Sequence, residues 1–133
     1  MALVWFVVML ALLEYYWFSL QVGAARGRWK IAAPAVTGHP DFERVYRVQM
    51  NTLEQLIVFI PAILAFAEFV STIWAAALGL IFVIGRAIYA IGYRRAAEKR
   101  GLGFVISALP LLALLLGALI GSGQRAWTAL GGP

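Results

Sequence analysis

Two long apolar runs constrain this chain more than any other feature. Residues 102–123 carry no charged side chain, and residues 2–22 carry only one, Glu14. A helix that crosses a bilayer needs roughly 20 apolar residues, so both runs are long enough to span a membrane. Residues 45–70 and 73–95 each join a fully apolar half to a half with polar side chains. The sequence therefore predicts an all-α fold, an integral membrane four-helix bundle that forms a single domain over residues 1–133. The four helices are expected near residues 2–25, 40–70, 73–98 and 102–127.

The composition supports lipid as the main solvent of the chain. Apolar residues make up 63% of the sequence and charged residues 13%, and the mean hydropathy is +0.87. A chain of 133 residues is too small to bury that much apolar surface in its own core. Cysteine is absent and there is one histidine, which excludes disulfides and Cys-ligated metals and argues against a His-based centre. We therefore predict no metal site.

The basic residues predict the orientation of the bundle. Nine of the eleven gather at the first and third predicted loops: Arg26, Arg28, Lys30, Arg44, Arg47, Arg94, Arg95, Lys99 and Arg100. Loops rich in Lys and Arg stay in the cytoplasm, so both termini are expected on the opposite side. No basic residue precedes the first apolar run, which favours a retained helix over a signal peptide. The net charge of +5 is thus a topology signal, and no nucleic-acid partner is predicted.

Polar residues inside the spans form two stripes at the same expected depth. The spacing of each set, mostly three or four residues, places its members on one helical face. The first stripe is Arg44, Arg47, Asn51 and Glu54, and the second is Arg86, Tyr89, Tyr93 and Arg100. Guanidinium groups bind carboxylates, a carboxylate binds an ammonium group, and a nearby cation favours thiolate over thiol. The stripes therefore favour a site for an anionic solute, one that can include a thiol.

The same side chains could instead satisfy one another. Arg47 with Glu54, or Arg86 with Glu14, could form structural ion pairs between helices. The sequence alone leaves both interpretations open.

Three segments carry a resemblance to a known family. Residues 42–55 read FERVYRVQMNTLEQ, residues 85–100 read GRAIYAIGYRRAAEKR, and residues 18–26 read FSLQVGAAR. In this order and spacing they resemble the MAPEG family, membrane-associated proteins in eicosanoid and glutathione metabolism. The resemblance implies a four-helix membrane bundle that assembles as a homotrimer. It also implies that glutathione binds between neighbouring subunits towards the cytoplasmic side.

The resemblance further implies roles for individual residues. Glutathione would be held from one subunit by Arg47, Asn51, Glu54, Tyr89 and Tyr93, and from the next by Arg26, Gln49 and Arg100. Arg100 would be the catalytic residue, because it matches the arginine that stabilises the glutathione thiolate. Glutathione would serve as co-substrate, and a lipophilic acceptor would arrive from the lipids of the bilayer. The implied activity is conjugation of lipophilic electrophiles or reduction of lipophilic peroxides, a detoxification chemistry.

Departures from the family pattern limit this inference. Gly27 and Gln55 stand where the leukotriene-forming relatives have an arginine and a tyrosine, which argues against leukotriene formation. A non-catalytic lipid- or partner-binding protein of the same fold is an alternative function. A more remote one is a small proton-coupled multidrug exporter that uses Glu14. The compact length is typical of a bacterial member, so the inner membrane is the expected location.

Overall fold

A computed structural model describes residues 1–132 of the chain. It contains four long helices: α1 (Ala2–Trp29), α2 (Pro40–Phe69), α3 (Thr72–Arg95) and α4 (Gly101–Ala129). A single 3-10 turn, η1 (Ala97–Arg100), joins α3 to α4. All four helices are long and apolar enough to cross a membrane. The predicted all-α four-helix membrane architecture is confirmed.

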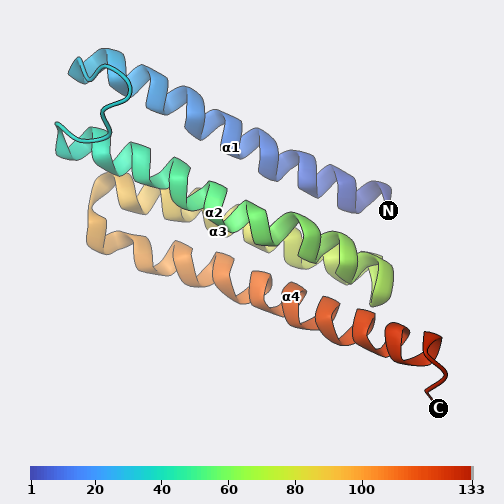
Figure 1. Cartoon of the computed structure of the whole chain (residues 1–133). Coiled ribbons are helices and arrows are strands. Elements are labelled where there is room, and N and C mark those ends of the chain that lie inside the picture. The colour runs from blue at the N-terminus through green and yellow to red at the C-terminus, as the bar shows by residue number, and fades with distance from the viewer. Residues whose placement is uncertain (133) are drawn as a thin grey trace.

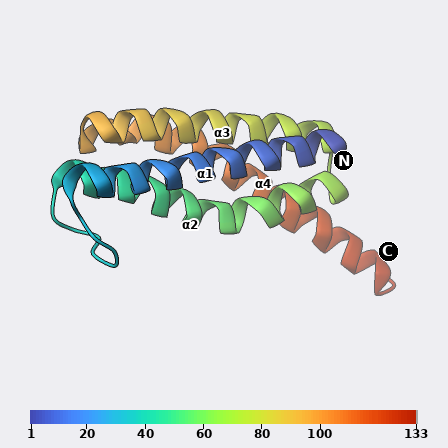
Figure 2. The same cartoon turned by 90° about the horizontal axis from the view of Figure 1, so that it is seen from above.

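The helices run alternately up and down, so the two termini lie at one end of the bundle (Figure 1). The α1–α2 loop and η1 lie together at the other end, as the view from above also shows (Figure 2). We call this the loop end. Both α2 and α3 pack against each other and against the two outer helices, α1 and α4. The two loops that carry most of the basic residues thus meet at the same end of the molecule.

Two helix ends differ from the sequence-based expectation. The first helix runs on to Trp29 because nothing breaks it before Lys30, which adopts a left-handed conformation (φ 55°). The third helix ends at Arg95, three residues earlier than expected, because Ala96 is extended (φ −162°). The chain then turns tightly through η1 and enters α4 directly.

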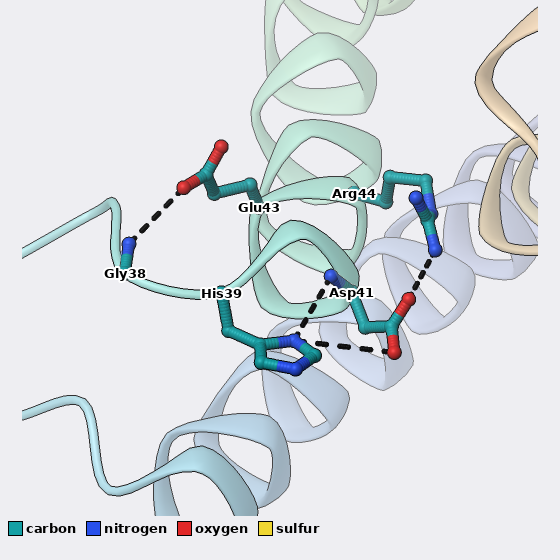
Figure 3. A network of polar contacts seen from close by, with 5 residues as sticks. All are labelled: Gly38, His39, Asp41, Glu43 and Arg44. Atoms are coloured by element: carbon teal, nitrogen blue, oxygen red, sulfur yellow. Dashed lines mark hydrogen bonds and ion pairs between the residues drawn. The ribbon is translucent and has the colours of Figure 1, made fainter.

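Polar contacts fix the start of α2 at the loop end (Figure 3). Pro40 occupies the first turn, where its missing N–H leaves no bond unmade. The backbone N–H of Asp41 donates to Nδ1 of His39 (3.2 Å), and that of Gly38 donates to the Glu43 carboxylate (3.0 Å). Arg44 forms an ion pair with Asp41. This network anchors the loop next to the polar stripe of α2.

Close contact between α3 and α4 sets the position of the second stripe. A Cβ atom on Gly85 would lie 2.6 Å from the backbone nitrogen of Ser107. One on Gly103 would overlap the backbone of Tyr89. Small residues allow helices in a membrane to approach at backbone distance. The two glycines therefore let α3 and α4 pack tightly next to Tyr89.

The main apolar core lies in the half of the bundle nearer the termini. Phe59 and Phe82 are fully buried there and stack at a centroid distance of 4.1 Å. Large apolar side chains also cover the outside of the bundle, where Ile73 is 74% exposed and Leu119 is 66% exposed. An exterior this apolar matches the hydrocarbon of a bilayer.

Candidate functional site

A cavity of about 300 Å³ opens at the loop end between α2, α3 and α4. We call it the Arg100 cavity. It is lined by Arg47, Asn51, Tyr89, Arg100, Gly101 and Phe104. Four of these six were predicted as site residues, and they come from three different elements of the fold. The structure thus brings the two polar stripes together around one space.

A second cavity of about 480 Å³ lies beside it, towards the α1–α2 loop. We call it the Arg44 cavity. It is lined by Val36, Pro40, Glu43, Arg44, Tyr46, Arg47 and Tyr93. Arg47 borders both cavities, and Tyr89 stacks on Tyr93 at 5.6 Å, with one ring in each lining. The two cavities are therefore neighbouring parts of one polar region.

Charges in this region are arranged by contacts along α2. The Arg47 guanidinium lies 3.7 Å from the Glu54 carboxylate, and Asn51 donates a hydrogen bond to the same carboxylate (3.3 Å). Both ends of the Arg47–Glu54 pair are about half exposed, so the pair is available to a solute. The Oδ1 atom of Asn51 is buried and accepts no hydrogen bond within residues 1–132. An acceptor without a donor partner in a polar cavity fits a ligand that carries an ammonium or amide N–H group.

Arg100 reaches the cavity by a route that the sequence did not predict. The spacing placed it on the face of the third helix, but α3 has ended five residues earlier. The η1 turn brings Arg100 back over the bundle, where its guanidinium lies 5.4 Å from the centroid of the Tyr93 ring. Its side chain is exposed and faces the cavity at the start of α4.

Comparisons with known proteins agree with this architecture. The model of the MAPEG family matches residues 3–120. Human microsomal glutathione S-transferase 2 is 44% identical over 115 residues, which cover 85% of this chain and 78% of that protein. Leukotriene C4 synthase of Bos taurus is 36% identical over 115 residues, covering 86% and 77%. The protein sll1147 of Synechocystis sp. is 46% identical over 111 residues, covering 84% and 81%.

The chain belongs to the MAPEG family. The match runs through all four helices, and this MAPEG chain is accordingly an integral membrane protein. Within the described residues, no group of three or more His, Cys, Asp or Glu side chains could hold a metal ion.

Two predicted site residues of this MAPEG chain, Arg26 and Gln49, line neither the Arg100 cavity nor the Arg44 cavity. Arg26 donates to the carbonyl oxygens of Ala35 (2.7 Å) and Ile31 (3.4 Å) and so holds the α1–α2 loop. Gln49 donates to the hydroxyl of Ser19 on α1 (3.0 Å). In a single chain, the structure does not bring these two residues to the other six.

Some residues at the cavities were not predicted from the sequence. Phe104 and Gly101 line the Arg100 cavity, and Tyr46 lines the Arg44 cavity. Phe104 is 45% exposed one helical turn after Arg100. Phe104 follows Arg100 by four positions, and this spacing places the two on the same face of a helix, which could have identified Phe104 from the sequence.

Proposed function

We propose that this MAPEG protein is a glutathione-dependent membrane transferase that acts on lipophilic electrophiles. The observation that carries the proposal is the convergence of Arg47, Asn51, Tyr89 and Arg100 on one cavity at the loop end. Its relatives include proteins named microsomal glutathione S-transferase 2 and leukotriene C4 synthase. Reduction of lipophilic peroxides by the same thiolate belongs to the proposal.

The chemistry of glutathione matches the groups around the cavities. The molecule carries two carboxylates, one ammonium group and one thiol. Arginine side chains such as Arg47 and Arg44 offer paired hydrogen bonds to carboxylates. Glu54 offers a carboxylate to the ammonium group, and Tyr89 and Tyr93 offer phenol groups along the peptide. Each charge of the co-substrate then has an opposite charge on the protein.

In the proposed reaction, Arg100 stabilises the thiolate form of glutathione. A cation beside a sulfur lowers the pKa of the thiol and raises the nucleophile fraction at neutral pH. The thiolate attacks an electrophilic carbon, a carbon–sulfur bond forms, and the leaving group departs with its electron pair. Phe104 and the exposed apolar side chains of α4 give the acceptor an apolar approach from the bilayer.

We further propose that the site is completed by a second subunit in a homotrimer. Arg26 belongs to α1 and Gln49 donates to Ser19 of α1, and neither lines the Arg100 or the Arg44 cavity of its own chain. A neighbouring copy that presents its α1 side to the Arg100 cavity would supply them. In this arrangement the loop end faces the cytoplasm, where glutathione is available, and both termini face the opposite side of a bacterial inner membrane.

The main experiment is a titration of the purified protein with glutathione, followed by the ultraviolet absorbance of the thiolate. We expect Arg100→Ala to abolish the absorbance at neutral pH. Glu54→Ala is expected to raise the glutathione concentration that is needed but to keep the absorbance at saturation. Lys99→Ala is the matched control, since Lys99 is an exposed cation of the same turn that lines neither cavity.

Two outcomes would contradict the proposal. Full thiolate formation by Arg100→Ala would remove Arg100 from the catalytic role. Thiolate formation by the wild-type protein without turnover of any lipophilic electrophile would favour a non-catalytic binding protein of the same fold.

Mixed trimers test the position of the site between subunits. Arg26→Ala and Arg47→Ala are each expected to weaken glutathione binding. When the two variants are assembled together, some interfaces combine an intact Arg47 with an intact Arg26 of the neighbour. We expect activity to return in the mixture. If mixing restores nothing, the site lies within one chain.

A further inference from the structure

A cavity of about 420 Å³ lies between the last turns of α2 and α4, at the end of the bundle opposite the loop end. We call it the terminal cavity. It is lined by Glu68, Phe69, Gly121, Gln124, Arg125 and Thr128. None of these residues lines the Arg100 cavity or the Arg44 cavity. The proposed reaction therefore leaves the terminal cavity without a role.

The course of α4 opens this cavity. A Cβ atom on Gly121 would lie 3.1 Å from the carbonyl oxygen of Phe69, so the backbones of α4 and α2 come close at that level. After Gly121, the last turns of α4 run past the end of α2 and away from the other helices (Figures 1 and 2). The terminal cavity lies between these last turns and the end of α2.

The terminal cavity contains one charge of each sign, and the two do not pair. Glu68 and Arg125 are exposed, and within residues 1–132 neither forms an ion pair. The gathering of basic residues at the loop end does not account for Arg125, which lies at the other end. A purely anionic ligand would be repelled by Glu68 and a purely cationic one by Arg125. A ligand that joins an anion to a cation would satisfy both side chains.

The surroundings of the terminal cavity indicate that its ligand is a lipid. Trp74 and Trp127, near the same end of the bundle, are 65% and 61% exposed, and exposed tryptophans gather at the depth of the lipid headgroups. Ile120 and Leu116 precede Gln124 by four and eight positions on one face of α4 and are 61% and 48% exposed. The polar cavity thus continues into an apolar surface towards the middle of the bilayer.

We propose that the terminal cavity binds the headgroup of a phospholipid that carries a phosphate and a primary ammonium group. Arg125 binds the phosphate oxygens, and Glu68 accepts a charge-assisted hydrogen bond from the ammonium group. The side-chain oxygens of Gln124 and Thr128 accept its other N–H groups. A trimethylammonium headgroup has no N–H donor and a glycerol headgroup has no cation, so both fit less well. This inference goes beyond the proposed function and does not depend on glutathione.

The test is a native mass spectrometry titration of the detergent-solubilised protein with three lipids in equal amounts. These are dioleoyl phosphatidylethanolamine, phosphatidylcholine and phosphatidylglycerol, which share their acyl chains and differ in headgroup mass. We expect the ethanolamine lipid to bind about fivefold more tightly than the other two, because an exposed ion pair contributes up to about 1 kcal/mol.

Variants at the two charges assign the preference to the terminal cavity. Glu68→Gln is expected to abolish the preference for ethanolamine over choline, and Arg125→Gln to weaken binding of all three phosphates. Glu68→Lys is expected to reverse the preference towards phosphatidylglycerol, since two cations would then line the cavity. Glu98→Gln and Arg95→Gln are the matched controls, because they remove exposed charges at the loop end that line none of the three cavities.

A competitor without acyl chains separates a lipid from a soluble ligand with the same headgroup. Glycerophosphoethanolamine is expected not to displace the ethanolamine lipid at equal concentration. Displacement would show that the apolar surface of α4 plays no part, and it would overturn a lipid as the occupant.

Two other outcomes would overturn the proposal. Equal binding of the three lipids by the wild-type protein would show that the headgroup is not recognised. A preference that persists in both Glu68→Gln and Arg125→Gln would place the recognition elsewhere. Glutathione binding is expected to be unchanged in both variants. A wild-type protein that binds no glutathione would refute the proposed function alone, and the lipid preference would stand or fall by its own titration.

Discussion

Replacing Gly103 by alanine tests the close approach of α3 and α4 that places Tyr89 beside Arg100. The added Cβ would lie 2.7 Å from the carbonyl carbon of Ile88 and nearer still to the backbone nitrogen of Tyr89. Both are backbone atoms, so no side chain can rotate away, and the two helices must separate. The single methyl group of Gly103→Ala would therefore push apart α3 and α4, which together line one side of the Arg100 cavity.

The expected cost can be worked out from two opposing effects. Overpacking a tight contact costs about 1–3 kcal/mol. Alanine favours a helix over glycine by about 1 kcal/mol, which offsets part of that cost. We expect Gly103→Ala to lower the free energy of unfolding by up to about 2 kcal/mol. Gly123→Ala is the control in the same helix, because a Cβ there meets nothing within 4 Å. It is expected to be neutral or stabilising.

The assay is unfolding in mixed micelles with increasing dodecyl sulfate, followed by the fluorescence of the five tryptophans. Glutathione affinity is measured on the same samples, and we expect it to fall only in Gly103→Ala, because Tyr89 is displaced. If Gly103→Ala is as stable as Gly123→Ala and binds glutathione equally well, the contact between α3 and α4 does not position the site.

Three further changes test other parts of the structure, the first two by the same unfolding assay. Phe82→Ala is expected to cost about 3–5 kcal/mol because the ring is fully buried, whereas Leu109→Ala, at a side chain 63% exposed, is expected to cost much less. His39→Ala removes the acceptor for the N–H of Asp41 and is expected to cost about 0.5–2 kcal/mol; no loss would show that this cap does not stabilise α2. Arg47→Ala breaks only an exposed ion pair, so we expect a stability change below about 1 kcal/mol. In the titration, however, it should weaken glutathione binding about tenfold, since hydrogen bonds to charged groups contribute about 1.5–3 kcal/mol, and unchanged affinity would exclude a ligand contact.

The helices could be predicted because the signals for them are local. A bilayer requires each spanning segment to satisfy its own backbone hydrogen bonds, so an apolar run of sufficient length is a helix almost regardless of its neighbours. The clustering of basic residues in two segments also predicted that the first and third loops lie at the same end of the bundle. The pattern also placed Arg47, Asn51 and Glu54 on one face of α2, since a regular helix fixes those angles.

The directions of Arg26 and Gln49 could not be predicted from one chain. Gln49 lies two positions from Arg47, which turns it by about 200° around the helix. What it meets on that side depends on where α1 packs, and in this structure it meets Ser19. Sequence spacing gives the angle of a side chain around its helix, but a distant segment of the chain decides its partner.

Arg86 and Arg100 show how a regular spacing can combine residues that lie in different environments. Both were placed on one stripe with Tyr89 and Tyr93, because helical periodicity reports a shared face. Helical periodicity does not show how deeply a side chain is buried in the bundle, nor at which residue the helix ends. Arg86 lies three residues before Tyr89, about 4.5 Å further along the axis, and is enclosed by α2 and α3. Arg100 lies beyond the end of α3 and reaches the cavity through η1. A stripe that the spacing assigns to one face therefore divides into an exposed cation that lines the Arg100 cavity and a buried cation whose guanidinium lies 4.1 Å from the ring of Tyr89.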